Sequence, residues 1–155
     1  MKLWIDGDSL PRDLRAFLLR RAGSSRGGGK FPELLFVSAK RLPDIPPELS
    51  RLVEAGPDAV DRFIEAGAIQ SDLVVTRDTA LAERLADRGI YVLNDRGDVF
   101  TSENAAERRS LRDAALQLRN LGLAPPSPKG SQRTARELKS FADSLDRLLS
   151  KIERQ

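Results

Sequence analysis

The sequence predicts an α/β protein with a mostly parallel sheet of four strands and helices on both faces. Four short apolar runs, at residues 2–6, 33–38, 72–76 and 90–93, have the length and composition of buried strands. Segments with apolar residues at helical spacing alternate with these runs, and this alternation favours parallel strands joined by helices. After residue 94 the pattern contains helices only.

The first predicted strand is followed by a helix. Ser9 is a good N-cap and Pro11 is tolerated in a first turn, so we expect the helix to begin there. Glycine-rich residues 23–29 form a break before the second strand. Residues 39–55 contain three prolines and are predicted to be irregular, with a short helical turn near residues 49–53.

Two more helices and two more strands complete the predicted sheet. Pro57 and Asp58 open a helix that ends near Gly67. The third strand is followed by a helix over residues 79–88, which Gly89 ends. The fourth strand follows directly, so each helix returns the chain to the start of a parallel strand.

The last third of the chain is predicted to be helical. One helix covers residues 102–121, a proline-rich linker covers 122–130, and a long helix covers 131–153. The long helix carries seven apolar residues at helical spacing, so this stripe must pack on the core or on a second subunit. We expect the 155-residue chain to form one domain, with an α/β core at 1–100 and a helical extension at 101–155.

The composition excludes several kinds of site. The sequence has no cysteine, which rules out disulfides, thiolate catalysis and cysteine-held metals. It has no histidine, so neither a Ser-His-Asp triad nor a histidine-bound zinc can exist. A metal would have to bind oxygen ligands, which suits Mg²⁺ or Mn²⁺.

Apolar runs and charge bear on location and partners. No apolar run spans a membrane, and the start of the chain lacks the long apolar stretch of a signal peptide. We therefore expect a cytoplasmic protein with no membrane partner. The first 100 residues carry 15 basic and 16 acidic side chains, whereas the last 55 carry 11 and 7. This basic second part is compatible with an anionic partner but does not require one.

Aspartates gather where the predicted strands end. Asp6 and Asp8 follow the first strand, Asp78 follows the third, and Asp58 and Asp61 begin the helix before it. In a parallel sheet, ligands bind outside the carboxyl ends of the strands, near a switch in strand order. Converging carboxylates repel one another, and a divalent cation relieves that repulsion. The pattern thus predicts a metal site with Asp6 and Asp78 as its central, catalytic ligands.

Helix capping is the alternative explanation for three of these residues. Asp8, Asp58 and Asp78 each stand directly before a helical pattern, and aspartate is a preferred N-cap. Asp61 lies in a first turn, where a carboxylate complements the helix dipole. Asp6 fits neither explanation, because it ends an apolar strand and its carboxylate would be partly buried. A shared metal site is therefore the favoured hypothesis.

Five further residues are candidate substrate contacts. Thr76, Arg77 and Asn94 lie at the ends of the third and fourth strands, and Ser110 and Arg112 lie on the helix that follows. Hydroxyl and guanidinium groups suit phosphate oxygens. A solvated helix face explains the last two equally well.

Several blocks of the sequence resemble the YaiI/YqxD family of uncharacterised bacterial proteins. They come in the family's order and cover most of the chain. The blocks are residues 3–11 (LWIDGDSLP), 56–61 (GPDAVD), 71–78 (SDLVVTRD), 93–97 (LNDRG) and 109–113 (RSLRD), with SQR at 131–133 and FA at 141–142. The family often has Ala-Cys-Pro where this chain has Ser9-Leu10-Pro11, and Asn-Pro-Arg-Gly where it has Asn94-Asp95-Arg96-Gly97.

The resemblance implies a three-layer fold of the PIN-like nuclease superfamily. Members of that superfamily use clustered carboxylates to bind Mg²⁺ or Mn²⁺ and cut RNA. Asp6, Asp78, and either Asp58 or Asp61 match its acidic metal-site positions, and Asp8 belongs to the same opening motif.

Three functions are compatible with these observations. The leading hypothesis is metal-dependent hydrolysis of RNA phosphodiester bonds at the aspartate cluster. A phosphatase of the haloacid dehalogenase type would use Asp6 as nucleophile and Asp8 as acid/base, although Ser9 stands where that family has Thr or Val. A non-catalytic module would keep the fold and the metal, or bind nucleic acid, without turnover.

Overall fold

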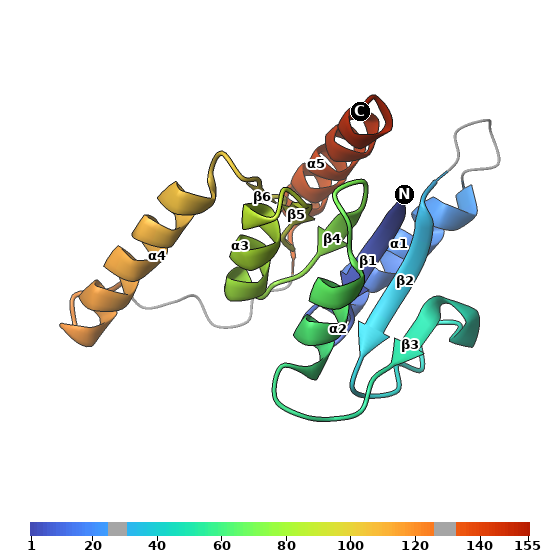
Figure 1. Cartoon of the computed structure of the whole chain (residues 1–155), viewed down its shortest axis with the longest axis horizontal. Coiled ribbons are helices and arrows are strands. Elements are labelled where there is room, and N and C mark those ends of the chain that lie inside the picture. Colours follow the sequence, from blue (N-terminus) through green and yellow to red (C-terminus); the bar gives the residue numbers. More distant parts are fainter. Residues whose placement is uncertain (25–30, 126–132) are drawn as a thin grey trace.

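A computed structural model describes residues 1–24, 31–125 and 133–155 (Figure 1). Its strands form one sheet in the order β3-β2-β1-β4-β5-β6. The first five are parallel, and β6 runs antiparallel to β5. The strands are β1 (Lys2–Asp6), β2 (Glu33–Ser38), β3 (Ser50–Leu52), β4 (Leu73–Val75), β5 (Tyr91–Leu93) and β6 (Val99–Phe100).

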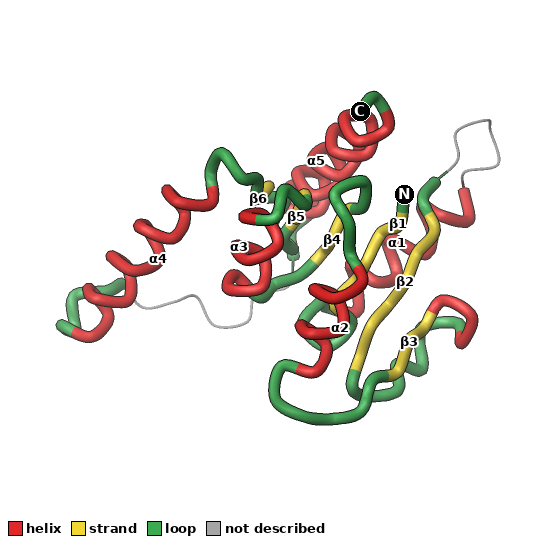
Figure 2. The backbone as a smooth tube through the Cα atoms, in the orientation of Figure 1, coloured by secondary structure: helices red, strands yellow, loops and turns green. Residues whose placement is uncertain are grey.

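Helices cover both faces of the sheet, which gives the three layers that the sequence predicts (Figure 2). One face packs against α1 and α5, and the other against α2 and α3. Successive residues of β1 serve opposite layers, because Leu3 and Ile5 join the first core cluster while Trp4 joins the second. The helices are α1 (Arg12–Ser24), α2 (Ala59–Gly67), α3 (Thr79–Asp87), α4 (Ala105–Asn120) and α5 (Ala135–Glu153).

The four predicted strands are all present, but the sheet has six strands among the described residues. The prediction of irregular structure between residues 39 and 55 was wrong in part. Pro47–Leu49 form a 3-10 turn, and Ser50–Leu52 then pair with the end of β2. This short edge strand is largely exposed, so it has no apolar run. The second addition, β6, has two residues and forms a hairpin with β5.

Some helix boundaries also differ from the sequence prediction. The first helix begins at Arg12 rather than at Ser9, so Ser9 is not its N-cap. The last helix begins at Ala135, where the Thr134 hydroxyl and the Glu137 carboxylate form a reciprocal capping box. The linker predicted at 122–130 and the start of the helix predicted at 131 lie partly outside the described residues.

The apolar stripe of α5 packs on the core rather than on a second subunit. Phe141 and Leu145 are fully buried. The Phe141 ring packs edge-on against the Phe17 ring of α1, with 5.9 Å between the ring centroids. By contrast, α4 points away from the sheet (Figure 1) and leaves Leu111 65% exposed. Among the described residues, no helix is both long and apolar enough to cross a membrane.

Because α5 completes one layer of the core, truncating its central aromatic side chain should destabilise the fold. We expect Phe141→Ala to lower the free energy of unfolding by about 3–5 kcal/mol. Leu111→Ala, on the exposed face of α4, should change it by less than about 0.5 kcal/mol. Urea denaturation of both variants measures the difference, and equal losses would contradict this placement of α5.

Candidate functional site

The strand order reverses beside β1, and this switch point is the setting of the candidate site. From β1 the chain builds outward through β2 to β3, and it then crosses back to place β4 on the other side of β1. The carboxyl ends of β1 and β4 therefore border the crevice where doubly wound sheets bind ligands. Asp6 ends β1, and Thr76 directly follows β4.

Asp6 and Asp78 are joined through the hydroxyl of Thr76. Asp6 is only 3% exposed, and its Oδ2 accepts a hydrogen bond of 2.7 Å from Thr76 Oγ1. The same Oγ1 accepts the backbone N–H of Asp78 at 3.0 Å. The hydroxyl donates its one proton to Asp6, and its lone pairs remain free to accept the N–H of Asp78. The Thr76 side chain therefore fixes the positions of both acidic residues.

Ser9 closes the network from the β1–α1 loop. Its backbone N–H donates to Asp6 Oδ1 at 3.2 Å, and its Oγ accepts the backbone N–H of Arg77 at 3.1 Å. The Ser9 and Thr76 hydroxyl oxygens lie 3.4 Å apart. Both oxygens of the buried Asp6 carboxylate are thus hydrogen-bonded, as a buried charge requires.

Asp61 lies in the first turn of α2 and Asp78 directly precedes α3, and these two helices cover the same face of the sheet. Asp78 caps α3, because its Oδ1 accepts the backbone N–H of Leu81 at 2.9 Å. Partial burial raises the pKa of Asp61, and the negative charges of Asp78 and Asp6 raise it further. These interactions show that Asp6, Asp61 and Asp78 share one region at the carboxyl edge of the sheet.

The other two predicted metal ligands, Asp8 and Asp58, lie on the surface. Asp8 is exposed, and its Oδ2 accepts the backbone N–H of Ala39 at 2.9 Å, which ties two loops together. Asp58 is exposed, with a backbone φ of 54°, and its side chain makes no capping hydrogen bond. The alternative explanation, helix capping, therefore holds for the Asp78 side chain. Asp58 occupies the N-cap position of α2 without a capping hydrogen bond, and Asp8 lies before the start of α1.

The donor set fits a hard cation only if water or substrate completes the coordination. Within the described ranges, no three acidic side chains are arranged so that they could hold a metal ion by themselves. Mg²⁺ keeps several waters in proteins and needs only one or two carboxylates, often with phosphate oxygens. Asp6, Asp61 and Asp78 supply carboxylate oxygens alone, which is the ligand chemistry that Mg²⁺ and Mn²⁺ prefer.

The five candidate substrate contacts fall in different places. Thr76 is fully buried, so its hydroxyl positions the aspartates and has no free face for a substrate. Asn94 uses its side chain in the β5–β6 turn, where it accepts the backbone N–H groups of Arg96 and Asp98. Arg77, by contrast, is 52% exposed beside Asp78.

The α4 candidates lie at the junction of α4 with α3. Ser110 donates to the carbonyl of Ala106 one turn earlier on its own helix. Arg112 Nη1 pairs at 2.7 Å with the buried carboxylate of Glu83 on α3. The structure therefore assigns both residues contacts that anchor or stabilise the helix, and it does not join them to Asp6 and Asp78.

Sequence reasoning named Arg77 but missed Arg84 and Arg133, and it missed the ion pairs that all three arginines form. Asp95 Oδ2 lies 3.2 Å from Arg77 Nε and 3.2 Å from Arg133 Nη2, and Arg133 also reaches Asp13. Arg84 of α3 pairs with Asp61 of α2. Such partners lie 18 to 120 residues apart, so no local pattern reveals them. The one available signal was the position of Arg133 in a block that resembles the family.

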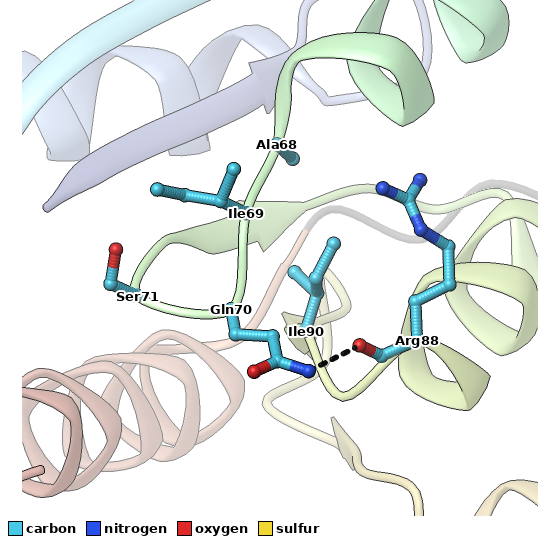
Figure 3. A pocket seen from close by; sticks show the side chains of 6 residues that line it. All are labelled: Ala68, Ile69, Gln70, Ser71, Arg88 and Ile90. Carbon is cyan, nitrogen blue, oxygen red and sulfur yellow. Dashed lines mark hydrogen bonds between the residues drawn. The ribbon is translucent and has the colours of Figure 1, made fainter.

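An open pocket exists elsewhere on the molecule (Figure 3). It is lined by residues 68–71, which precede β4, and by Arg88 and Ile90, which precede β5. The pocket therefore lies at the amino ends of the parallel strands, opposite the aspartates. No acidic side chain lines it, and Gln70 Nε2 closes one side by donating to the Arg88 carbonyl at 3.1 Å.

Comparison with known proteins identifies the family. The model of the uncharacterised YaiI/YqxD family matches residues 4–151. The chain belongs to this family. A UPF0178 protein of Treponema pallidum is 42% identical over 99% of this chain and 84% of its own length. A UPF0178 protein of Myxococcus xanthus is 38% identical over 98% of this chain and 96% of its own length. No solved structure matches the chain.

Members of the YaiI/YqxD family thus share nearly the whole length of this chain, including the aspartate region and α5. The family resemblance seen in the sequence is confirmed. The printed names of these relatives state no activity, so function has to be argued from the site itself.

The Thr76 hydroxyl should matter for stability, because it hydrogen-bonds a buried carboxylate. Thr76→Val keeps the shape of the side chain but leaves Asp6 Oδ2 without its donor. We expect a loss of about 2–3 kcal/mol in the free energy of unfolding. Thr79→Val, at the exposed start of α3, is the matched control and should be nearly neutral. A melting temperature for Thr76→Val equal to that of the wild type would contradict this network.

The raised pKa of Asp61 predicts a particular pH dependence. The folded state binds this proton more tightly than the unfolded chain, so stability is highest below the usual value of 3.8 and falls as pH rises through the raised pKa. The Asp61→Asn variant has no carboxyl group at this position, so its stability does not fall for this reason as the pH rises. Its unfolding free energy, relative to wild type, should therefore increase from acidic to neutral pH.

Urea denaturation at a series of pH values tests this, with Asp113→Asn as the control. Asp113 is an α4 carboxylate with a side chain 66% exposed. A difference between Asp61→Asn and wild type that stays constant with pH, or shrinks toward neutrality, would refute the electrostatic account of Asp61.

Proposed function

We propose that this protein is a metal-dependent nuclease of the PIN-like type that hydrolyses RNA phosphodiester bonds. The observation that carries the proposal is the network at the switch point of the sheet, in which the Thr76 hydroxyl joins the buried Asp6 to Asp78. Burial raises the pKa of Asp61 most, and the charges of Asp78 and Asp6 raise it further. A divalent cation would relieve this repulsion between carboxylates.

The residues divide into ligands and positioning groups. Asp6 and Asp78 are the proposed central ligands of Mg²⁺ or Mn²⁺, and Asp61 completes the set from α2. The Asp78 carboxylate keeps its Oδ2 for this task, because only Oδ1 caps the helix. Thr76 and Ser9 hold Asp6 in place. When bound, such an ion supplies an activated water and neutralises charge on the phosphate.

Arg77 is the proposed contact for the RNA backbone. It is the residue directly before Asp78, and its guanidinium is half exposed next to the Asp95 carboxylate. Asp95 is also bound by Arg133, which pairs with Asp13 as well, so Arg77 shares its carboxylate partner and keeps N–H groups free for a phosphate. Positive charge beside the cation attracts a phosphodiester and holds it in place.

The geometry supports a haloacid-dehalogenase-type phosphatase less well. In that chemistry Asp6 would attack phosphorus, yet it is almost fully buried and both of its oxygens accept hydrogen bonds. Asp8 would act as acid/base, but it is exposed and bonded to a backbone N–H. A non-catalytic, metal-binding or nucleic-acid-binding module shares the proposed site and differs only in turnover.

The remaining apolar surface bears on a possible second subunit. The core covers the α5 stripe, whereas Leu111 and Leu121 near α4 are 65% and 71% exposed. These exposed leucines lie on α4 and directly after it, so this helix is the proposed contact surface of a homodimer.

Metal binding should depend on Asp6 and Asp78 and not on acidic residues in general. Asp78→Asn keeps an acceptor for the α3 cap but removes the charge, so apo stability should be unchanged or higher. We expect Asp6→Asn and Asp78→Asn each to weaken Mn²⁺ binding by about 10–100-fold, comparable with the loss of a metal-site partner. Asp113→Asn should bind as the wild type does. Calorimetric titration gives these affinities.

Cleavage of single-stranded RNA by the same proteins separates the candidate functions. The nuclease proposal predicts cleavage by wild type with Mn²⁺, none with EDTA, and strong loss in both site variants. Mn²⁺ binding without cleavage would favour the non-catalytic module. Equal Mn²⁺ affinity in wild type and both variants would contradict the metal site and the nuclease together.

A further inference from the structure

Arg84 is the cation that the structure supplies to the carboxylate group. Its Nη2 lies 3.3 Å from Asp61 Oδ2. Among residues 1–24, 31–125 and 133–155, it is the only basic side chain paired with Asp6, Asp61 or Asp78. The guanidinium is 47% exposed, so packing does not fix it in one position.

Arg84 has a second and closer partner in Glu65. Its Nε lies 2.5 Å from Glu65 Oε1, against 3.3 Å for the contact with Asp61. Asp61 and Glu65 are four residues apart on α2, so they are neighbours on one helix face. One guanidinium from α3 thus bridges two carboxylates of α2, and the tighter contact is the one further along the helix from Asp6 and Asp78.

The two contacts of Arg84 are unequal in length and in exposure. Asp61 is the more buried of the two carboxylates, with 14% of its side chain exposed against 26% for Glu65. Arg84 therefore keeps its shorter contact, the one with Glu65, if Asp61 turns to another cation.

We propose that Arg84 is a built-in counter-cation that competes with the metal for Asp61, while Glu65 retains Arg84 when Asp61 binds the ion. This inference rests on the proposed metal site. Arg84 is a positioning residue in this scheme, because it acts on the ion through Asp61. It stabilises the metal-free site and lowers metal affinity, so it sets the cation concentration at which the site fills.

Removal of Arg84 and removal of Glu65 should have opposite effects on Mn²⁺ affinity. Arg84→Gln removes the competitor, and we expect Mn²⁺ to bind on the order of tenfold more tightly, as for loss of one nearby charge. Glu65→Gln releases Arg84 onto Asp61, and Mn²⁺ should bind several-fold more weakly. Arg84→Lys keeps the charge and should stay near wild type.

Two further variants test whether the effect is specific to Arg84. Arg109→Gln removes a comparable guanidinium, 40% exposed and paired with Asp87 of α3, and it should leave Mn²⁺ affinity within about twofold of wild type. The double variant Arg84→Gln/Glu65→Gln tests the route of coupling. If Glu65 acts through Arg84, Glu65→Gln should have little effect once Arg84 is gone.

Melting curves give a readout that does not depend on activity. Without metal, Arg84→Gln should melt below wild type, because the carboxylates lose their counter-charge, and saturating Mn²⁺ should remove that difference. A merely structural salt bridge predicts a loss that Mn²⁺ does not restore, and an unchanged affinity.

The outcomes separate this inference from the proposed function. Wild type that binds Mn²⁺, together with an Arg84→Gln variant that binds equally or more weakly, would overturn the role of Arg84 and leave the metal site standing. Failure of the wild type to bind Mn²⁺ would overturn both. Tighter binding by Arg84→Gln that Arg109→Gln does not reproduce supports the inference.

Discussion

The burial of the Asp6 carboxylate at the end of the central strand is the constraint on which the candidate site depends. A buried carboxylate is costly unless hydrogen bonds or a cation compensate it. Thr76 and the Ser9 backbone supply the hydrogen bonds, and in doing so they fix the loop after β1 and the loop after β4. Because the Thr76 hydroxyl also accepts from Asp78, the start of α3 is set by the same contact. The hydrogen bonds that satisfy the Asp6 carboxylate thus also place Asp78 beside it.

The fold could be predicted from the sequence wherever apolar periodicity was strong. The strands containing Ile5, Phe36, Val74 and Val92 are buried on both faces, and their runs are visible in the sequence. The edge strands could not be predicted, because β3 is largely exposed and β6 has two residues. The wrong start of α1 has a physical reason: Ser9 looks like an N-cap, but its N–H and hydroxyl serve Asp6 and Arg77 instead.

The candidate site was predictable in its acidic members and in Arg77, and not in its other basic residues. Asp6 and Asp78 follow strand patterns, so topology alone brings them together. Asp8 and Asp58 also stand before helical patterns, and local spacing does not say whether their carboxylates face the solvent or the crevice. Arg84 and Arg133 meet their partners through tertiary contacts across helices and loops, which a single sequence does not encode locally. The site has an excess of negative charge that Arg84 partly balances. This charge balance can therefore be seen only in the folded structure.

Locating a bound ion directly tests the central claim, that Asp6 and Asp78 belong to one cation site at the switch point. Crystals grown with saturating Mn²⁺ would reveal the ion by its anomalous scattering. This account predicts a strong anomalous peak at the carboxyl ends of β1 and β4, within coordination distance of at least one oxygen of Asp6 or Asp78, with water completing the shell. An ordered site with no peak there, or a peak confined to another part of the surface, would contradict it.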